Sequence, residues 1–196
     1  MRVLLVYCHP VPESFNAAVR DRAVAALAAA GHEVDLLDLY AEGFDPVLSA
    51  DERRAYHEAG VNEAPVAGHL ARLKACEALI FVFPTWWYGP PAMLKGWVER
   101  VFVPHATFGM PQPGRPITRV LTNIRVLGAI STLGAPRWWW WFMGMPGRRM
   151  LLTGLGVLCA EGCRTFWMGL HEMDSAARED RERYLDRVAA RLKRLG

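Results

Sequence analysis

The sequence predicts an α/β fold in which a parallel sheet of five strands carries helices on both faces. Short apolar runs rich in Val, Leu, Ile and Phe recur along the chain, and such runs are typical of strands buried on both faces. Helical segments separate consecutive runs, and this alternation produces parallel sheets. Neither a repeat nor a linker divides the sequence, so we expect one domain over residues 1–196.

The N-terminal part begins with a strand, a helix and a second strand. Residues 2–7 (RVLLVY) form the first apolar run, and residues 33–39 (EVDLLDL) form the second. Between them, an Ala-rich segment starts at Ser14, a good N-cap, and stops at Gly31, which favours a helix C-terminus. These signals predict one long helix between two strands.

Three further elements precede the middle of the chain. Ser49 and Glu52 have the spacing of a capping box, which predicts a short helix to about Ala59. Residues 65–75 are predicted to form a polar helix, and the apolar run at residues 78–83 (ALIFVF) is the third strand.

The second half continues the alternation. Residues 91–102 are predicted to form a helix, residues 125–132 a strand, residues 146–162 a helix despite their glycines, and residues 164–170 the fifth strand. The tail, residues 175–195, is an amphipathic helix.

Composition and charge exclude several classes of function. The net charge of +3 comes without a dense Lys/Arg block, so we expect no nucleic-acid partner. No run reaches the roughly 18 apolar residues of a membrane span, and the N-terminal apolar stretch is too short for a signal peptide. The four cysteines lack metal-ligand spacing. We therefore expect a cytoplasmic protein with reduced thiols and no metal.

Ligands of such sheets bind beyond the carboxyl ends of the strands. Three loops lie there, at residues 8–14, 84–90 and 131–137. The first loop opens a helix, so free N–H groups around Phe15 and Asn16 form an anion site. Ser14 and His9 could add donors to a phosphate. Alternatively, Ser14 only caps the helix and His9 has a structural or surface role.

The second loop, PTWWYGP, places three large rings where a buried strand ends. Its backbone N–H groups could bind the edge of a flat heterocycle while a ring stacks on its face. Core packing is the alternative, although consecutive residues cannot all face one core. The loop residues in question are Pro84, Thr85, Trp86, Trp87 and Tyr88.

The third loop, STLGAP, supplies the hydroxyls of Ser131 and Thr132 together with Gly134. These groups could donate to carbonyl oxygens on the opposite edge of the same heterocycle. Together the three loops describe a phosphate at one end and a flat, hydrogen-bonding ring at the other. A flavin matches both.

Three stretches resemble the flavodoxin-like NAD(P)H:quinone oxidoreductases. They are HPVPESFN at residues 9–16, DLYAEGFDPVLS at residues 38–49, and FPTWWYGPPAMLKGWVERVF at residues 83–102. The third is a long and specific match to that family's signature. The resemblance covers residues 1–135 well and the rest loosely.

The resemblance implies a flavodoxin-like three-layer sandwich, a homodimer with two active sites at its interface, and bound FAD, or FMN as in some relatives. It implies hydride transfer from NAD(P)H through flavin N5 to a quinone or similar flat acceptor in one pocket. It assigns the cofactor to His9, Ser14, Phe15, Asn16, Pro84, Thr85, Trp86, Trp87, Tyr88, Ser131, Thr132, Leu133 and Gly134.

The resemblance also places Phe108 and Met110 over the acceptor pocket, facing the partner's flavin. The run Trp138–Trp141 has three interpretations, namely interface or core packing, an aromatic lid on the pocket, and insertion into a membrane surface. If the run forms a lid, Trp138 contacts the substrate.

Two departures from the family concern the third loop. Leu133 replaces a glycine, and neither a Tyr nor a His follows within about a dozen residues, although relatives use such a pair to stabilise charge during hydride transfer. Arg137, or Arg148 with Arg149, could replace that pair electrostatically.

Two other functions are open to this fold. One is a one-electron carrier, which usually docks through a strongly charged face that the sequence lacks. The other is a regulatory subunit of a membrane potassium-efflux system, as some relatives are.

Overall fold

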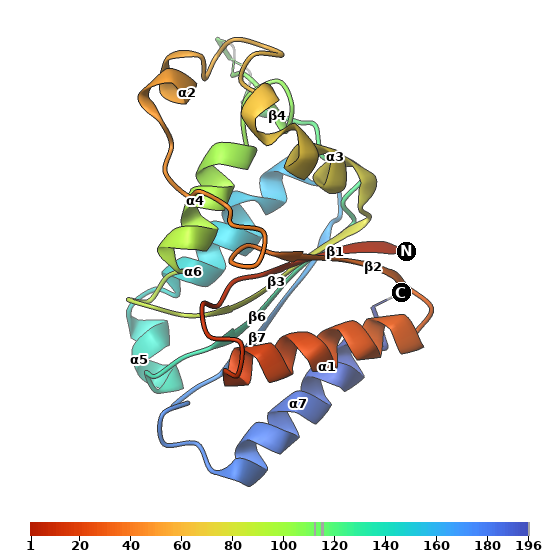
Figure 1. Cartoon of the computed structure of the whole chain (residues 1–196), viewed down its shortest axis with the longest axis vertical. Coiled ribbons are helices and arrows are strands. Elements are labelled where there is room, and N and C mark those ends of the chain that lie inside the picture. The colour runs from red at the N-terminus through yellow and green to blue at the C-terminus, as the bar shows by residue number, and fades with distance from the viewer. Residues whose placement is uncertain (112, 115, 196) are drawn as a thin grey trace.

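The computed structural model describes residues 1–111, 113–114 and 116–195. Five parallel strands form one sheet in the order β2-β1-β3-β6-β7 (Figure 1). The strands are β1 Arg2–Tyr7, β2 Glu33–Asp38, β3 Ala78–Pro84, β6 Val126–Thr132 and β7 Arg164–Leu170. The fold class predicted from the sequence is confirmed, and the strand bounds agree to within one residue.

Helices cover both faces of the sheet, which gives three layers (Figure 1). On one face, α1 (Phe15–Ala29) and α7 (Arg178–Leu192) pack on β-strand side chains such as Ile80 and Val82. On the other face lie α3 (Ala67–Ala75), α4 (Ala92–Val101) and the segment 146–158, over a core that contains Phe81. Every residue of β3 and β6 is buried, as expected for central strands covered on both sides.

The register brings the three loops of interest to the same edge. Pro84, the last residue of β3, pairs with Thr132, the last residue of β6. Tyr7 at the end of β1 pairs with Val82, two residues before the end of β3. The loops that follow β1, β3 and β6 therefore start at nearly the same height.

Several predicted helices are shorter than expected. The capping box at Ser49 is present, but α2 (Ala50–Arg54) ends five residues before Ala59. The segment predicted as a helix over residues 146–162 is divided into α6 (Pro146–Arg148), a π-helix (Arg149–Gly154) and a 3-10 turn (Gly156–Leu158). Its glycines weaken regular helix, so the chain alternates between hydrogen-bond spacings. The short turn Ala64–Val66 precedes α3.

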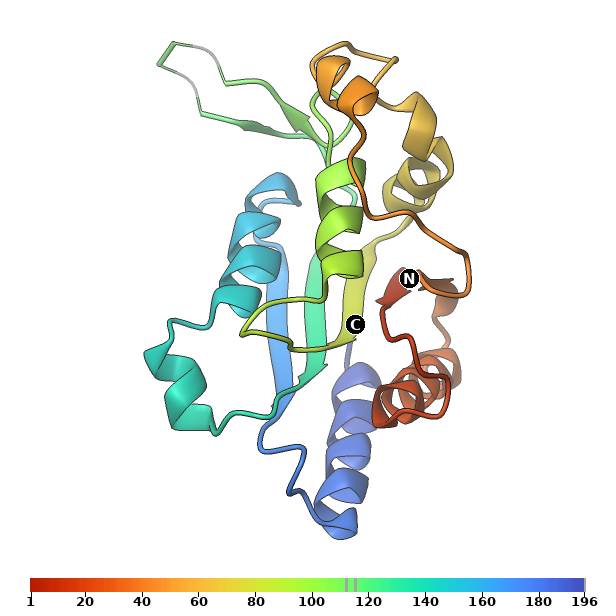
Figure 2. The ribbon, with the colours of Figure 1, turned by 60° about the vertical axis from the view of Figure 1, so that its left-hand side comes forward.

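Two elements were not predicted. The tryptophan run forms α5 (Arg137–Phe142). Beyond α4, β4 (Phe108–Gly109) and β5 (Thr118–Arg119) pair as a small antiparallel hairpin (Figure 2). Both are too short to produce a periodic signal in sequence.

The four cysteines are reduced, and burial raises the pKa of Cys8 and of Cys76 to about 12. Within the described ranges, no group of three or more His, Cys, Asp and Glu side chains could hold a metal ion. None of the described helices is long and apolar enough to cross a bilayer.

Candidate functional site

Hydrogen bonds tie the three loops into one rim at the carboxyl ends of the strands. Asn16 Nδ2 donates to Thr132 Oγ1 over 2.9 Å and so joins the first loop to the third. Thr85 and Ser131 share a hydroxyl hydrogen bond of 2.7 Å, and the Thr85 N–H donates to the Thr132 carbonyl over 2.7 Å. The structure therefore brings together residues that lie more than 100 positions apart in the chain.

The first loop ends in a capped helix, as predicted. Ser14 Oγ accepts from the Ala17 N–H over 3.2 Å, so the capping role of Ser14 is present. The N–H groups of Phe15 and Asn16 precede the first bond within the helix and have no backbone partner in the described part of the chain. Asn16 is 5% exposed, and its Oδ1 has no hydrogen-bond partner. The helix start therefore offers N–H donors and one unused acceptor toward the rim.

His9 lies beside the second loop, with its ring centroid 6.1 Å from that of Trp86. The Val11 N–H donates to His9 Nδ1 over 3.0 Å, a shorter contact than the 3.3 Å between Nδ1 and the Val11 carbonyl oxygen. Because a backbone N–H can only donate, Nδ1 is the acceptor and the neutral ring carries its proton on Nε2. Partial burial lowers the pKa of His9 and so favours this neutral form. His9 can therefore donate one N–H from Nε2.

The second loop is a tight turn with an unusual backbone. Trp86 and Gly89 exchange two backbone hydrogen bonds of 3.0 Å each, and the residues between them, Trp87 and Tyr88, have φ values of 48° and 64°. Such turns normally use Asn or Gly at both central positions, because larger side chains are strained in left-handed backbone. Here both positions hold large aromatic rings. The side chain of Trp87 is 95% exposed, so core packing does not account for its size.

Tyr88 is clamped from the opposite side of the rim. Its hydroxyl accepts from Trp139 Nε1 over 2.9 Å, and its carbonyl accepts from the Gly147 N–H over 3.2 Å. A Cβ at position 147 would lie 3.3 Å from that carbonyl oxygen, so glycine permits the close approach. The segment 137–147 therefore holds the strained turn in place.

The third loop differs from the sequence expectation in how its backbone is used. The Leu133 N–H donates to the Leu170 carbonyl over 2.8 Å, and the Leu133 carbonyl accepts from Met173 over 3.0 Å. Both backbone groups of Leu133 are thus already paired, and the residue contributes its side chain instead. Gly134 is exposed, and a Cβ there would lie 2.9 Å from Asp174 Oδ2.

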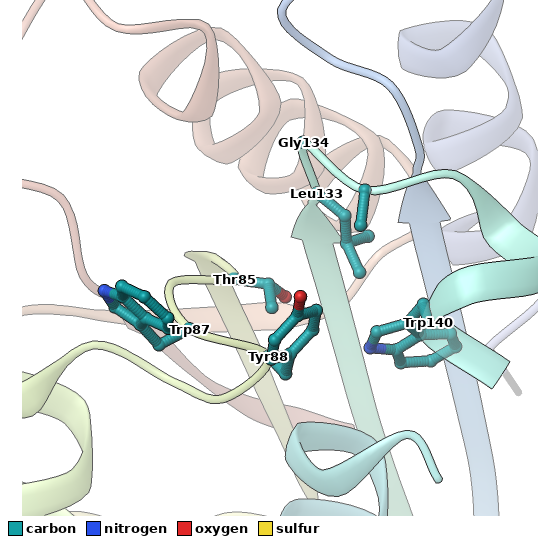
Figure 3. A pocket seen from close by; sticks show the side chains of 7 residues that line it. Thr85, Trp87, Tyr88, Leu133, Gly134 and Trp140 are labelled. Atoms are coloured by element: carbon teal, nitrogen blue, oxygen red, sulfur yellow. The ribbon is translucent and has the colours of Figure 1, made fainter. Parts of the chain in front are cut away.

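Two adjoining cavities open on this rim. The first, of about 290 Å³, is lined by Thr85, Trp87, Tyr88, Leu133, Gly134, Ala135 and Trp140. Figure 3 shows Tyr88 between Trp87 on one side and Trp140 on the other, with Leu133 and Gly134 at the end of β6. The second, of about 450 Å³, shares four of these residues and extends to Pro84, Thr132 and Asp174. Together they combine aromatic rings and Leu133 with polar groups such as Thr132 and Asp174, as small-molecule sites do.

Trp140 is a site residue that the sequence did not single out. It lines the first cavity, is 4% exposed and stacks on Trp167, with centroids 5.0 Å apart and planes at 23°. Trp138 is 67% exposed and lines neither cavity. Four consecutive tryptophans carry no signal that says which ring faces inward, because this depends on where α5 begins.

Phe108 and Met110 lie away from the rim of their own chain. They follow α4, whose ten residues span about 15 Å. Figure 2 shows the β4–β5 hairpin at the far end of this helix from the 84–91 loop. In a single chain these two side chains therefore do not reach the cavities.

Comparison with known proteins agrees with the fold. A family profile described as flavodoxin-like fold matches residues 1–192. The chain belongs to this flavodoxin-like family. The match includes all three loops of the rim and all five strands.

Individual relatives of this flavodoxin-like chain include named oxidoreductases. It is 36% identical over 118 residues to the NAD(P)H dehydrogenase [quinone] 1 of Cavia porcellus, a match that covers 52% of this chain and 42% of that protein. The chain thus spans about half the length of the curated relatives it matches. A solved NAD(P)H:quinone oxidoreductase from Methanothermobacter marburgensis is 25% identical, with a TM-score of 0.84 over 100% of this chain and 99% of that one. An FMN-dependent NADH-azoreductase from Bacillus anthracis, 15% identical with a TM-score of 0.78 over 99% and 98% of the two chains, shares the fold.

Proposed function

We propose that this chain is a flavin-dependent NAD(P)H oxidoreductase that reduces a quinone or a similarly flat acceptor. The observation that carries the proposal is the cavity of about 290 Å³ bounded by the strained Trp87–Tyr88 turn. Backbone strain of about 1–3 kcal/mol per residue persists where function requires the conformation. The relatives among the NAD(P)H:quinone oxidoreductases support the same reaction.

The residues of the rim fit a flavin. The unpaired N–H groups at the start of α1 and the Nε2–H of His9 suit a phosphate. The buried Asn16 Oδ1, which lacks a partner, is an acceptor that a ring N–H or a ribityl hydroxyl would satisfy. The turn at residues 86–89 supplies a flat face. We propose FAD, with FMN as the alternative, because the HPVPESFN loop resembles that of the FAD-binding members.

When bound, the flavin supplies the two-electron chemistry between donor and acceptor. The chain itself binds the flavin, orients the donor and the acceptor, and excludes water from the site. Trp87 and Tyr88 define the plane in which a ring can lie, and Trp140 closes the cavity on the β7 side. Fixing donor and acceptor in one geometry accounts for about 7–11 kcal/mol of a barrier in favourable cases.

We further propose that the working unit is a homodimer. Phe108 and Met110 lie outside the rim of their own chain, so any rim cavity that they cover belongs to a second copy. This arrangement would complete the open side of the site.

The proposed function predicts that the purified protein is yellow and releases one flavin per chain on denaturation. It should oxidise NADPH or NADH faster when a quinone is added. Mass spectrometry of the released cofactor distinguishes FAD from FMN. A colourless protein that takes up neither flavin in a fluorescence titration would contradict the proposal.

A further inference from the structure

A cavity of about 580 Å³ lies at the outer edge of the sheet, beside β7. Residues of α5, α6 and α7 line it together with the strand itself. It is distinct from the two rim cavities, but Trp140 lines both it and the 290 Å³ cavity. The two spaces therefore meet at the ring of Trp140.

The charged side chains that line this cavity are all positive. Arg137, Arg148 and Arg187 line it from three separate helices, and no Asp or Glu is among the lining residues. Across the described residues, these three guanidinium groups form neither an ion pair nor a side-chain hydrogen bond. By contrast, Arg72 and Arg100 are each paired with carboxylates at 2.6 Å. Three unpaired guanidinium groups around one cavity favour an anion, above all a phosphate, which they can bind with two parallel hydrogen bonds.

The walls of the cavity also suit a flat aromatic base. Trp140 and Trp167 stack on each other at its inner wall, and the ring of Trp141 is 69% exposed at its mouth. A base that stacks on an indole face gains dispersion contacts without needing a specific partner. The cavity therefore combines aromatic surface with phosphate donors.

A polar niche within the cavity adds a donor and an acceptor. His171 Nδ1 lies 3.3 Å from the Ala135 carbonyl, to which it donates, so Nε2 is left as an acceptor. Trp167 Nε1 is buried and has no hydrogen-bond partner among the residues that the structure describes. A Cβ at Gly169 would lie 3.0 Å from Trp167 Nε1 and 3.2 Å from His171 Nε2, so glycine keeps the space between them open. A hydroxyl or amino group could bridge this donor and this acceptor.

We propose that this cavity binds the adenosine 2′,5′-bisphosphate end of NADPH and makes the protein prefer NADPH to NADH. The inference rests on the proposed function, because the nicotinamide end then lies in the rim cavity on the other side of Trp140. The guanidinium groups bind the phosphates and the indoles stack on the adenine. NADH lacks the 2′-phosphate and gains less from the arginines.

The test is calorimetric titration of the protein with adenosine 2′,5′-bisphosphate, both with and without added flavin. Arg148→Gln and Arg187→Gln should each raise the Kd of this compound about tenfold, because each removes one charge-assisted contact. Arg178→Gln is the matched control, since Arg178 lies on α7, pairs with Glu182 and does not line the cavity. In steady-state kinetics, the first two variants should raise the KM for NADPH more than the KM for NADH.

The inference is overturned if the wild-type protein does not bind adenosine 2′,5′-bisphosphate, or if both variants bind it as the control does. If Arg148→Gln fails to fold, the exposed Arg187→Gln still decides the question. Binding of this fragment requires no turnover, so it is separable from the proposed function. A protein that binds the fragment through these arginines but takes up no flavin retains the nucleotide site and contradicts the proposed oxidoreductase activity.

Discussion

Trp87 and Tyr88 show how single residues report on function at this rim. Both hold large rings at positive φ, in a turn where Gly or Asn would cost less. Trp87 is also almost fully exposed, so neither local conformation nor packing within the chain explains it. A contact beyond the chain itself, with a ligand or with a second copy, is the reason that remains for an indole at this position.

Trp87→Asn should therefore separate stability from binding. Asn tolerates left-handed backbone, so the free energy of unfolding of the flavin-free protein should rise by about 1 kcal/mol. Loss of the indole face should weaken flavin binding by about tenfold. Thermal unfolding and flavin fluorescence titration measure the two effects.

Phe142→Asn is the control for this prediction, because Phe142 is also a largely exposed aromatic residue, at 69%, but lines neither rim cavity. It should leave flavin affinity unchanged. If Trp87→Asn binds flavin as tightly as the wild-type protein, the turn is not a ligand face.

At the scale of elements, α4 is positioned by a close approach to the chain before α2. A Cβ at Gly96 would lie 2.2 Å from the Pro46 carbonyl oxygen, which is backbone and cannot move aside alone. Next to this contact, Arg100 on α4 pairs with Glu52 of α2 at 2.6 Å. The glycine within the stretch MLKGW is therefore a packing requirement, and it sets the distance between α4 and the segment 44–54.

Gly96→Ala should lower the free energy of unfolding by about 1–3 kcal/mol, because the added methyl group overpacks this contact. Gly68→Ala in α3 is the matched control, since nothing lies within 4 Å of a Cβ there. It should leave stability unchanged or raise it by up to about 1 kcal/mol. Urea unfolding of both variants decides the point, and equal stabilities would show that α4 is free to shift.

At the scale of the whole molecule, partial burial disfavours the charged state of several histidines. Burial lowers the pKa of His9, His32, His69 and His171, in each case as the largest cause. The folded protein therefore binds protons less readily than the unfolded chain, whose His pKa is about 6.5. Stability should be fully present above about pH 7 and decline as the pH falls through 6.5.

His69→Gln should reduce this pH dependence. His69 accepts from Trp97 Nε1 over 3.4 Å and packs edge-on against Phe44, in contact with the α4 core. Glutamine keeps an acceptor but does not titrate. Urea unfolding at pH 5.5 and 7.5 should show a smaller stability difference than in the wild-type protein. His57→Gln, at an exposed position, is the control. If the stability difference between pH 5.5 and 7.5 is as large in His69→Gln as in this control, His69 is not a source of the pH dependence.

The sheet could be predicted from the sequence, because buried strands such as ALIFVF and capped helices such as that after Ser14 produce local patterns. It also determined which three loops share the rim, since parallel strands end at one edge. Which groups of those loops remain free depends on tertiary contacts. The backbone N–H and carbonyl of Leu133 are hydrogen-bonded to Leu170 and Met173. Trp140, and not Trp138, lines the cavity. The physical reason is that backbone hydrogen bonding in a loop, and the direction in which a ring points, depend on contacts between residues far apart in the chain. For the same reason, no local sequence pattern predicts that Arg137, Arg148 and Arg187 lie together beside β7.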